Sequence, residues 1–289
     1  MNEFIPPVRL TQAAAPLTHE IDARDEFGAV RRIAIPAERA LTVFVDKREL
    51  VTLMTLGAAP ELLVLGYLRN QRLVDAASDI ESITVDWDVG AAAVNTRAGI
   101  ERFDEKTAKR VVTTGCGQGT VFGDLMSEVD SLQLPPATDP HARLSQAALY
   151  GLLNAMRVQE STYKSAGSVH GCALFRQSEL LMFVEDVGRH NAIDTIAGWM
   201  WLNGVGGADK AFYTTGRLTS EMVIKAAQMG VPAVVSRSGI TQMGHALGVQ
   251  LGMALFGRAM NRHFICYCGF QRFDAEPELK PEPRPETRT

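Results

Sequence analysis

The chain has 289 residues, of which 46% are hydrophobic and 21% charged, and its 29 basic and 33 acidic side chains give a net charge of −4. This composition predicts a globular protein with a sizeable core, and the charge argues against a nucleic-acid-binding surface. The four cysteines are too few for a disulfide scaffold and indicate a reducing, cytoplasmic compartment. The opening residues lack the pattern of a secretory signal, and Pro60 and Glu61 interrupt the most apolar stretch, so we expect no membrane span.

The first half of the sequence indicates a short tail followed by a small α+β domain. Residues 1–20 show no sustained hydrophobic period, so we expect an N-terminal tail. The α+β domain covers 21–136 and ends in the segment around Cys116 and the helical stretch after it, with Pro135 and Pro136 at the boundary. Within it we expect β structure over 26–45, a helix within 49–68, and short strands at 83–85 and 91–94.

Residues 137–273 alternate strands and helices, which is typical of an α/β domain with a parallel or mixed sheet. Ser145 and Thr241 are the expected N-caps of its first and last helices. Residues 274–289 alternate proline with charge, and we expect a disordered tail there. The expected helices cover 145–158, 191–202, 220–229 and 241–256, and the expected strands 173–175, 180–184, 211–214, 231–235 and 264–267.

The segment VVTTGCGQGT (111–120) places one thiol, Cys116, in a glycine-rich turn after a strand. A helix is expected over 121–129, and its N-terminus would lower the pKa of a nearby thiol and favour the thiolate. A thiolate attacks a sulfur donor or carries a transferable sulfur. The alternative is a tight turn in which the cysteine packs as a small hydrophobic residue. The glycine spacing does not fit a dinucleotide-binding fingerprint.

Polar clusters follow three strands of the predicted α/β domain, at 185–194, 213–221 and 236–241. Ligands gather at the carboxyl ends of strands in such sheets. Arg189 and Arg217 suit phosphate groups, and His190 suits acid–base work with Asp194 one helical turn away to orient it. Together the clusters favour a phosphate-rich ligand. The alternative for each cluster is an ordinary capped helix start with solvated charges.

The remaining cysteines invite a zinc interpretation that their spacing does not support. His170 and Cys172 lie two residues apart, as do Cys266 and Cys268. The sequence contains neither of the C-x-x-C and H-x-E motifs that usually supply the ligands of a zinc site. We therefore expect no metal site, and we interpret these cysteines as packing residues.

Three blocks, EDVGRHNA (185–192), TGRLTSEMV (215–223) and SRS (236–238) with Thr241, resemble signature blocks of the formate dehydrogenase accessory sulfurtransferases. The resemblance spans 25–273. It implies a homodimer and a cytidine deaminase-like α/β/α fold for 137–273 without a zinc site. It also implies that Cys116 accepts persulfide sulfur from a cysteine desulfurase and passes it to the molybdenum cofactor, bis(molybdopterin guanine dinucleotide), before that cofactor enters formate dehydrogenase.

Residue by residue, Cys116 matches the first cysteine of the family's C-G-x-C-G loop, whereas Gly119 stands where many members carry a second one. The resemblance also places His170 in a glycine-rich segment and the stretch 259–264 in a cofactor-binding region. With the strand-end side chains, the expected cofactor-binding residues are Ala259, Met260, Asn261, Arg262, His263, Phe264, His170, Arg189, His190, Arg217, Ser236 and Ser238.

Two alternatives stay open from the sequence. The first is a chaperone that binds a molybdenum or tungsten cofactor and delivers it without moving sulfur. This alternative stays open because Gly119 replaces the second loop cysteine. The second is a zinc-dependent deaminase, which the missing metal-ligand spacing disfavours.

Overall fold

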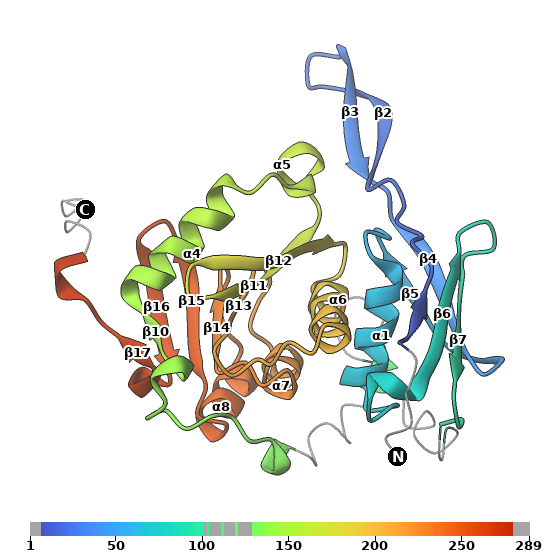
Figure 1. Ribbon diagram of the computed structural model, residues 1–289. Helices are drawn as coiled ribbons and strands as arrows, with labels where there is room; N and C mark the ends of the chain where they lie inside the picture. The colour runs from blue at the N-terminus through green and yellow to red at the C-terminus, as the bar shows by residue number, and fades with distance from the viewer. Residues whose placement is uncertain (1–6, 101–102, 104–110, 113–118, 121–128, 280–289) are drawn as a thin grey trace.

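The computed structural model of the chain describes residues 7–100, 103, 111–112, 119–120 and 129–279. The fold is mixed α/β, as predicted, and consists of two packed units (Figure 1). None of the helices in the described part is long and apolar enough to cross a membrane. Cys116 and the stretch 121–128, predicted to be helical, lie outside the described residues, as do the outermost parts of both expected tails.

The C-terminal unit is built on a sheet of six described strands, in the order β12-β11-β13-β14-β15-β16 (Figure 1). β13, β14 and β15 run parallel, whereas the other strands join by antiparallel pairing. Every residue of β13 and β14 is buried, as expected for parallel strands covered on both faces. The bounds are His170–Arg176 for β11, Glu179–Asp186 for β12, Ala211–Thr214 for β13, Ala233–Ser236 for β14, Ala254–Met260 for β15 and His263–Cys268 for β16.

Helices cover both faces of this sheet and make a three-layer α/β/α unit (Figure 1). Leu149 and Leu152 of α4 are fully buried against one face, and α6, α7 and α8 pack on the other. The Ser145 and Thr241 hydroxyls cap α4 and α8, as predicted, by accepting hydrogen bonds from backbone amides of the first turn. The bounds are Gln146–Val158 for α4, Arg189–Leu202 for α6, Ser220–Gln228 for α7 and Gln242–Gln250 for α8.

The structure corrects the predicted helix over 241–256. α8 ends at Gln250, and the residues from Ala254 onward form β15, which pairs in parallel with β14. Gly252 lies between them in a left-handed conformation, with a φ of 62°, which ends the helix. The apolar run that follows is buried on both faces of the sheet, and periodicity alone does not distinguish such a strand from a buried helix.

The N-terminal unit has a sheet of five described strands, in the order β1-β6-β7-β4-β5, with α1 packed on it. Leu41 and Val43 of β4 alternate into its core. The helix expected within 49–68 begins only at Pro60, because β5 precedes it. The bounds are Arg9–Leu10 for β1, Arg39–Val45 for β4, Arg48–Thr55 for β5, Pro60–Asn70 for α1, Ile80–Asp86 for β6 and Ala91–Thr96 for β7. A separate antiparallel pair is formed by β8 (Val111–Val112) and β9 (Gly119–Thr120).

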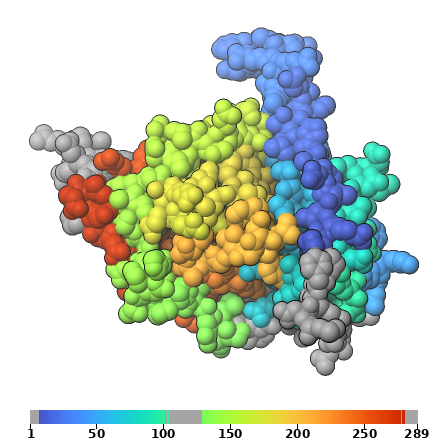
Figure 2. Space-filling model, viewed as in Figure 1, coloured from blue at the N-terminus to red at the C-terminus, as the bar shows by residue number. Residues whose placement is uncertain are grey.

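β2 (Thr18–Arg24) and β3 (Val30–Pro36) pair as a two-stranded arm that stands off the body of the molecule (Figure 2). The arm begins inside the expected N-terminal tail, and β1 lies within that tail as well. The tail prediction for 1–20 is therefore wrong in part. β1 pairs in parallel with β6, a strand about 70 residues away in the sequence. The residues of β1 therefore show no hydrophobic periodicity of their own from which a strand could be predicted.

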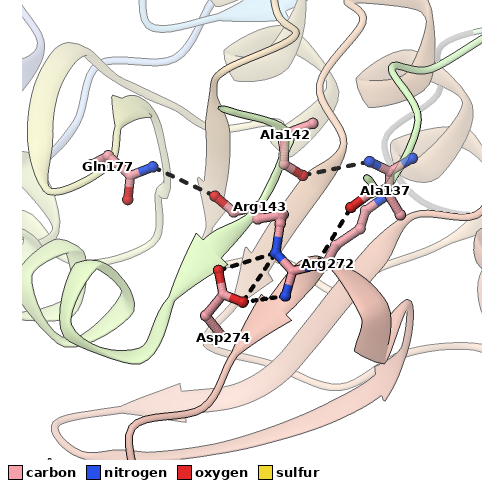
Figure 3. A network of polar contacts seen from close by, with 6 residues as sticks. All are labelled: Ala137, Ala142, Arg143, Gln177, Arg272 and Asp274. Atoms are coloured by element: carbon pink, nitrogen blue, oxygen red, sulfur yellow. Dashed lines mark hydrogen bonds and ion pairs between the residues drawn. The ribbon is translucent and has the colours of Figure 1, made fainter. Parts of the chain in front are cut away.

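The C-terminal segment is anchored on the start of α4 (Figure 3). β17 (Phe273–Asp274) pairs with β10 (Leu144–Ser145), and Asp274 forms an ion pair with Arg143, 131 residues earlier. Arg272 is buried and donates hydrogen bonds to three backbone carbonyl oxygens. The prediction of a disordered tail over 274–289 is wrong for its first residues. The partners that hold these residues are remote in sequence, so the local composition does not reveal them.

The two units join where α1 crosses α6, and at this crossing a glycine of each helix contacts the backbone of the other helix. A Cβ atom at Gly66 would lie 1.7 Å from the carbonyl oxygen of Asp194, and one at Gly198 would lie 2.0 Å from the carbonyl oxygen of Leu62. Only glycine permits so close an approach of two helices. α6 is consequently covered by α1 on one side and by the sheet on the other, and most of its side chains, polar ones included, are buried.

We expect Gly198→Ala to lower the free energy of unfolding by about 1–3 kcal/mol, because the added methyl group must push the two helices apart. Chemical denaturation followed by circular dichroism measures the change. Gly206→Ala is the matched control, since a Cβ atom there meets nothing within 4 Å. Equal stability of the two variants would contradict the close crossing.

Candidate functional site

Four strand ends meet at one edge of the six-stranded sheet. β12, β13, β14 and β15 end there, and β11 and β16 begin there. The structure thus brings together the polar segments 185–194, 213–221 and 236–241 and the stretch 259–264. Because ligands of open α/β sheets bind outside the carboxyl ends of the strands, this edge is the candidate site.

On the α4 face of the edge lies a cavity of about 350 Å³. It is lined by the end of α4, the short helix α5 (Thr162–Ala166) and the strand ends. Arg237 extends over the ring of Tyr163, with its guanidinium carbon 5.9 Å from the ring centre. Tyr213, Thr215 and Asn261 line the same cavity, which therefore offers an aromatic wall, a cation and hydrogen-bonding groups together.

Glu185 holds the aromatic wall in place. Its carboxylate accepts hydrogen bonds from the backbone amides of Thr162 and Tyr163 at the start of α5. The Lys164 ammonium group donates to two carbonyl oxygens at the end of α4, at 2.9 and 2.6 Å. These two charges fix α5 between the sheet and α4. Arg237, in contrast, is exposed and presents its guanidinium group at the cavity.

The predicted cofactor-binding stretch 259–264 forms the turn between β15 and β16. Asn261 adopts a left-handed conformation there, with a φ of 57°, and lines the cavity beside Met260. Arg262 lies over the ring of Tyr150 at 5.7 Å, next to a second hollow of about 390 Å³. Asn261 and Arg157 line both hollows, so the two spaces adjoin at this turn.

The residues at the two ends of that stretch contribute little to the hollows. Ala259 lines the cavity but is only 1% exposed. Phe264 packs edge-on against Phe256, with ring centres 5.7 Å apart. His263 is exposed but lines neither of the two hollows. The part of the stretch that opens on the two hollows is thus mainly 260–262.

His170, Arg189 and Arg217 gather on the opposite face of the same edge. The His170 Nδ1 atom lies 3.5 Å from the Thr215 hydroxyl. Burial, followed by the charges of Arg189 and Arg217, lowers the pKa of His170. The Arg189 side chain lies along Gly216, where a Cβ atom would approach its Cδ to 2.7 Å, so the glycine makes room for the arginine.

Ser236 and Ser238 shape the edge from within. The Ser236 hydroxyl donates to the Gly216 carbonyl at 2.6 Å and accepts from the Ser238 amide at 2.9 Å. Ser236 is fully buried. The structure places both serines where they connect two strand-end loops, and Ser236 has no surface to offer a ligand.

A buried polar chain explains His190 and Asp194. The Lys225 ammonium group lies 2.9 Å from Asp194 and 3.5 Å from Glu221. Glu221 in turn lies 3.1 Å from the Nε2 atom of His190, while Asn70 of α1 donates to Asp194 at 2.7 Å. The hypothesis that Asp194 orients His190 does not fit these contacts: the Asp194 carboxylate accepts hydrogen bonds from Asn70 and Lys225, and the carboxylate beside the imidazole is that of Glu221 on α7.

Charge and burial oppose each other along this chain. Burial alone would lower the pKa of Lys225, but the carboxylates of Asp194 and Glu221 outweigh it and raise that pKa. Burial dominates at His190 and lowers its pKa to about 3, so the imidazole is neutral. His190 therefore belongs to the interior that joins α6 to α7.

Asp186 ties the edge to the N-terminal unit. Its carboxylate accepts hydrogen bonds from the Thr55 hydroxyl at 2.5 Å and from the Leu56 amide at 3.1 Å, both at the end of β5. It also accepts from the Gly188 amide and the Asn191 side chain at the start of α6. Four donors on one buried carboxylate fix the position of the α6 N-terminus.

The described thiols are interior groups, in agreement with the prediction that they serve packing. Cys172 is fully buried, and burial raises its pKa to about 12. Burial likewise raises the pKa of Cys266 to about 11. Cys268 is 5% exposed, and its pKa is raised by burial too. Within the described residues, no three His, Cys, Asp or Glu side chains cluster as metal ligands.

Several residues of this site were not predicted. Arg237 lies within the segment 236–241, and a charged residue between two serines could have marked it as a ligand-binding candidate. The sequence around Tyr163 and Arg157 carries no such mark, because these residues reach the edge only through the packing of α4 and α5 on the sheet. Glu221 and Lys225 are spaced four apart on α7, a pattern that indicates a helix pair but not its burial.

The family model that matches this chain is that of the FdhD/NarQ family, and the match covers residues 36–274. The chain belongs to this family. Its relatives include two proteins named sulfur carrier protein FdhD. The one from Listeria monocytogenes serotype 4b (strain F2365) is 28% identical over 259 residues, 89% of this chain and 98% of the relative. The one from Bacillus subtilis (strain 168) is 30% identical over 247 residues, 84% of this chain and 92% of the relative.

The fold of this FdhD/NarQ family member is also found in a solved structure. The crystal structure of a putative formate dehydrogenase accessory protein from Desulfotalea psychrophila matches with a TM-score of 0.70 and 24% sequence identity. The match covers 89% of this chain and all of the other. The mixed α/β architecture is therefore shared with that protein at low sequence identity.

The neutral His190 makes stability depend on pH. The unfolded chain takes up a proton on this histidine near pH 6.5, whereas the folded protein does so only near 3. Between these values the unfolded state binds more protons, so the free energy of unfolding falls as the pH falls. We expect wild type to lose about 1.4 kcal/mol per pH unit more than His190→Gln in this window. Urea denaturation of both proteins at several pH values measures it, and parallel curves would refute it.

Proposed function

We propose that this chain is a sulfur carrier that serves formate dehydrogenase. In the proposed reaction Cys116 accepts sulfur from a cysteine desulfurase and passes it to the molybdenum cofactor, bis(molybdopterin guanine dinucleotide). The names of the relatives support the general role. The observation that carries the assignment to Cys116 is the distribution of thiols: the three described cysteines are half-buried or buried and have raised pKa values, which leaves Cys116 in its glycine-rich segment.

The first half-reaction is a thiol exchange. The Cys116 thiolate attacks the terminal sulfur of the desulfurase persulfide, the sulfur–sulfur bond of that persulfide breaks, and the desulfurase cysteine leaves as a thiolate. The transferred sulfur keeps its proton, so no further reactant is needed. A thiolate is required for the attack, and a buried thiol whose pKa is about 12 is a poor candidate.

The candidate edge fits a cargo that carries nucleotide groups. Tyr163 and Arg237 offer a flat aromatic and guanidinium surface for a base, and Asn261 offers hydrogen bonds beside them. Arg262 and Arg157 stand by the adjoining hollow, where phosphate groups would meet positive charge. We propose that these residues hold one guanine nucleotide of the cofactor, with 260–262 as the rim.

The resemblance extends this proposal to the setting of the reaction. We infer a cytoplasmic homodimer whose C-terminal unit is of the cytidine deaminase type. The three-layer arrangement, with a mixed sheet between α4 and the helices α6 to α8, supports the last point.

A second candidate function rests on one residue. Gly119 occupies the position of a second loop cysteine in many family members. A chaperone that delivers the cofactor without carrying sulfur would need neither thiol. Labelling of Cys116 distinguishes the two functions.

We expect incubation with a cysteine desulfurase and cysteine to add one sulfur atom, about 32 Da, to the peptide that contains Cys116. Intact-protein and peptide mass spectrometry detect the addition. Cys116→Ala removes it, whereas Cys266→Ser retains it, because the pKa of Cys266 is raised to about 11 and its thiolate is scarce. Full maturation of formate dehydrogenase by Cys116→Ala would favour the chaperone instead.

We expect guanosine diphosphate to bind the cavity and Arg237→Ala to weaken that binding roughly tenfold, through loss of a cation beside the base and phosphates. Calorimetric titration measures both affinities. Arg176→Ala is the matched control, since Arg176 is exposed at the opposite end of β11. Equal weakening by the two substitutions would mean that the nucleotide is attracted by general charge and not by this cavity.

A further inference from the structure

β12 is the outermost strand of the six-stranded sheet, and its outer side meets no other strand in the described part of the chain. It pairs with β11 alone, whereas β11 pairs on both of its sides. The residues from Leu180 to Val184 are all apolar, and the first four of them are only half-buried. An apolar strand with one unpaired side is a template to which a further strand can be added.

The β11–β12 ladder fixes which backbone groups of β12 point outward. The Gly171 amide donates to the Thr215 hydroxyl at 3.1 Å, and the Gly171 carbonyl accepts from the Thr215 amide at 2.9 Å, so both groups point toward β13. Glu185 is the ladder partner of Gly171, and in such an antiparallel pair the backbone groups of Glu185 point away from β11. The same holds two residues earlier, at Phe183. Among the described residues, no protein group binds the backbone of either residue on this outer side.

These backbone groups open on a groove of about 820 Å³, which we call the β12 groove. Residues 182–185 line it on the side of the sheet, and α5 forms one wall. The opposite wall consists of Leu17 and Thr18 at the base of the arm and of residues 58–59 before α1. β3 contacts α5, so the arm stands close beside this part of the sheet (Figure 1). The outer side of β12 therefore faces a walled channel rather than a flat surface.

The walls favour a single extended segment over a second folded body. A copy of this chain that brought its own β12 alongside would have to displace the arm and α5 (Figure 2). Antiparallel pairing of two β12 strands would also set Glu179 at one end opposite Asp186 at the other, and like charges directly opposite each other are destabilising. One strand with no sheet behind it avoids both costs.

The charges of the β12 groove indicate a basic side chain on the occupant. Lys164 donates to two backbone carbonyl oxygens, and the Glu185 carboxylate accepts from two backbone amides, so both charges are engaged within the fold. Glu160 is exposed at the groove, and no described group binds its carboxylate. The other lining residues are apolar or carry hydroxyl groups. A lysine or arginine on the occupant would complement Glu160.

We propose that the β12 groove is the docking site for an extended segment of a partner protein, which adds to β12 as a further strand. The backbone of this segment binds the outward amides and carbonyls of Phe183 and Glu185. Apolar side chains of the segment pack on the apolar lining, and a basic side chain pairs with Glu160. An unstructured tail or loop with alternating apolar residues and one cation has this chemistry.

The β12 groove and the nucleotide cavity share α5. Four residues line both spaces: Ser161, Lys164, Phe183 and Glu185. An added strand binds the backbone of Glu185, whose carboxylate holds the α5 amides beside Tyr163. Docking therefore steadies the aromatic wall of the cavity, and each ligand strengthens the binding of the other. The nucleotide in this coupling rests on the proposed function, whereas the docking site does not.

Amide hydrogen exchange of the full-length protein, resolved by nuclear magnetic resonance, tests the docking. The probe is an acetylated and amidated hexapeptide of alternating valine and threonine with a lysine at one end. We expect saturating peptide to slow exchange of the Phe183 and Glu185 amides about tenfold or more. The Val184 amide is expected to stay unchanged, because it already points toward β11.

The control peptide carries N-methyl groups on its central amides, which keeps the side chains and removes the donors. We expect it to bind about tenfold more weakly. Equal binding of the two peptides, or equal slowing at Val184, overturns the docking site. Protection of Phe183 and Glu185 before peptide is added overturns it as well. The outer side of β12 is then already covered, by a second copy if the protection grows with protein concentration and by the chain itself if it does not.

Charge reversal gives an independent measurement by calorimetric titration of the peptide. We expect Glu160→Lys to weaken binding roughly fivefold at low salt and less at high salt. Glu179→Lys is the matched control, because Glu179 is exposed at the far end of β12 and does not line the groove. Equal weakening by the two substitutions would mean that the peptide responds to net charge and not to this groove.

Titration of guanosine diphosphate with and without saturating peptide tests the coupling. We expect the nucleotide to bind about threefold more tightly in the presence of the peptide, with the same factor for the peptide in the presence of the nucleotide. An unchanged affinity contradicts the coupling. Peptide binding without nucleotide binding contradicts the proposed nucleotide site alone, and nucleotide binding without peptide binding contradicts the docking site alone.

Discussion

The fold depends on one residue, Asp194, at the crossing of α1 and α6. Its carbonyl oxygen faces Gly66 so closely that no side chain fits there, and its carboxylate binds Asn70 of α1 and Lys225 of α7. Lys225 and Asp194 are both fully buried. Removing one partner of such a pair leaves an uncompensated charge in the interior, so each charge holds the other in place. The two units keep separate hydrophobic cores, and the close helix crossing and this buried polar chain join them.

This buried junction decides which polar residues remain for a ligand. The segment 185–194 has the composition of a binding loop, yet Glu185 holds α5, Asp186 holds β5, and His190 and Asp194 hold α7. All four side chains are buried within the fold. The groups left at the surface are His170 and Arg217 on one face of the edge and Arg237 with 260–262 on the other. Burial, not polarity, separates the two groups of residues.

Much of the C-terminal unit was predictable, because its strands and helices alternate and Ser145 and Thr241 carry visible caps. β15 was not, since its apolar run is buried on both sides and has no diagnostic period. The anchored C-terminal segment depends on Arg143, 131 residues away, and β1 depends on β6. The cavity was equally hidden, because Tyr163 reaches it only after α5 has docked on Glu185. Pairings between distant segments leave no trace in local composition.

The same burial bears on how one thiol is selected from four. A cysteine with a pKa of about 12 is a thiolate at neutral pH in on the order of one molecule in 10⁵, and one with a pKa of about 11 in about one in 10⁴. A scarce thiolate makes these interior thiols poor acceptors of a persulfide sulfur, and Cys172 is in addition fully buried. A carrier must keep its sulfur on one residue until the acceptor arrives. If the proposed function holds, the packing of Cys172, Cys266 and Cys268 would supply this selectivity without a second loop cysteine.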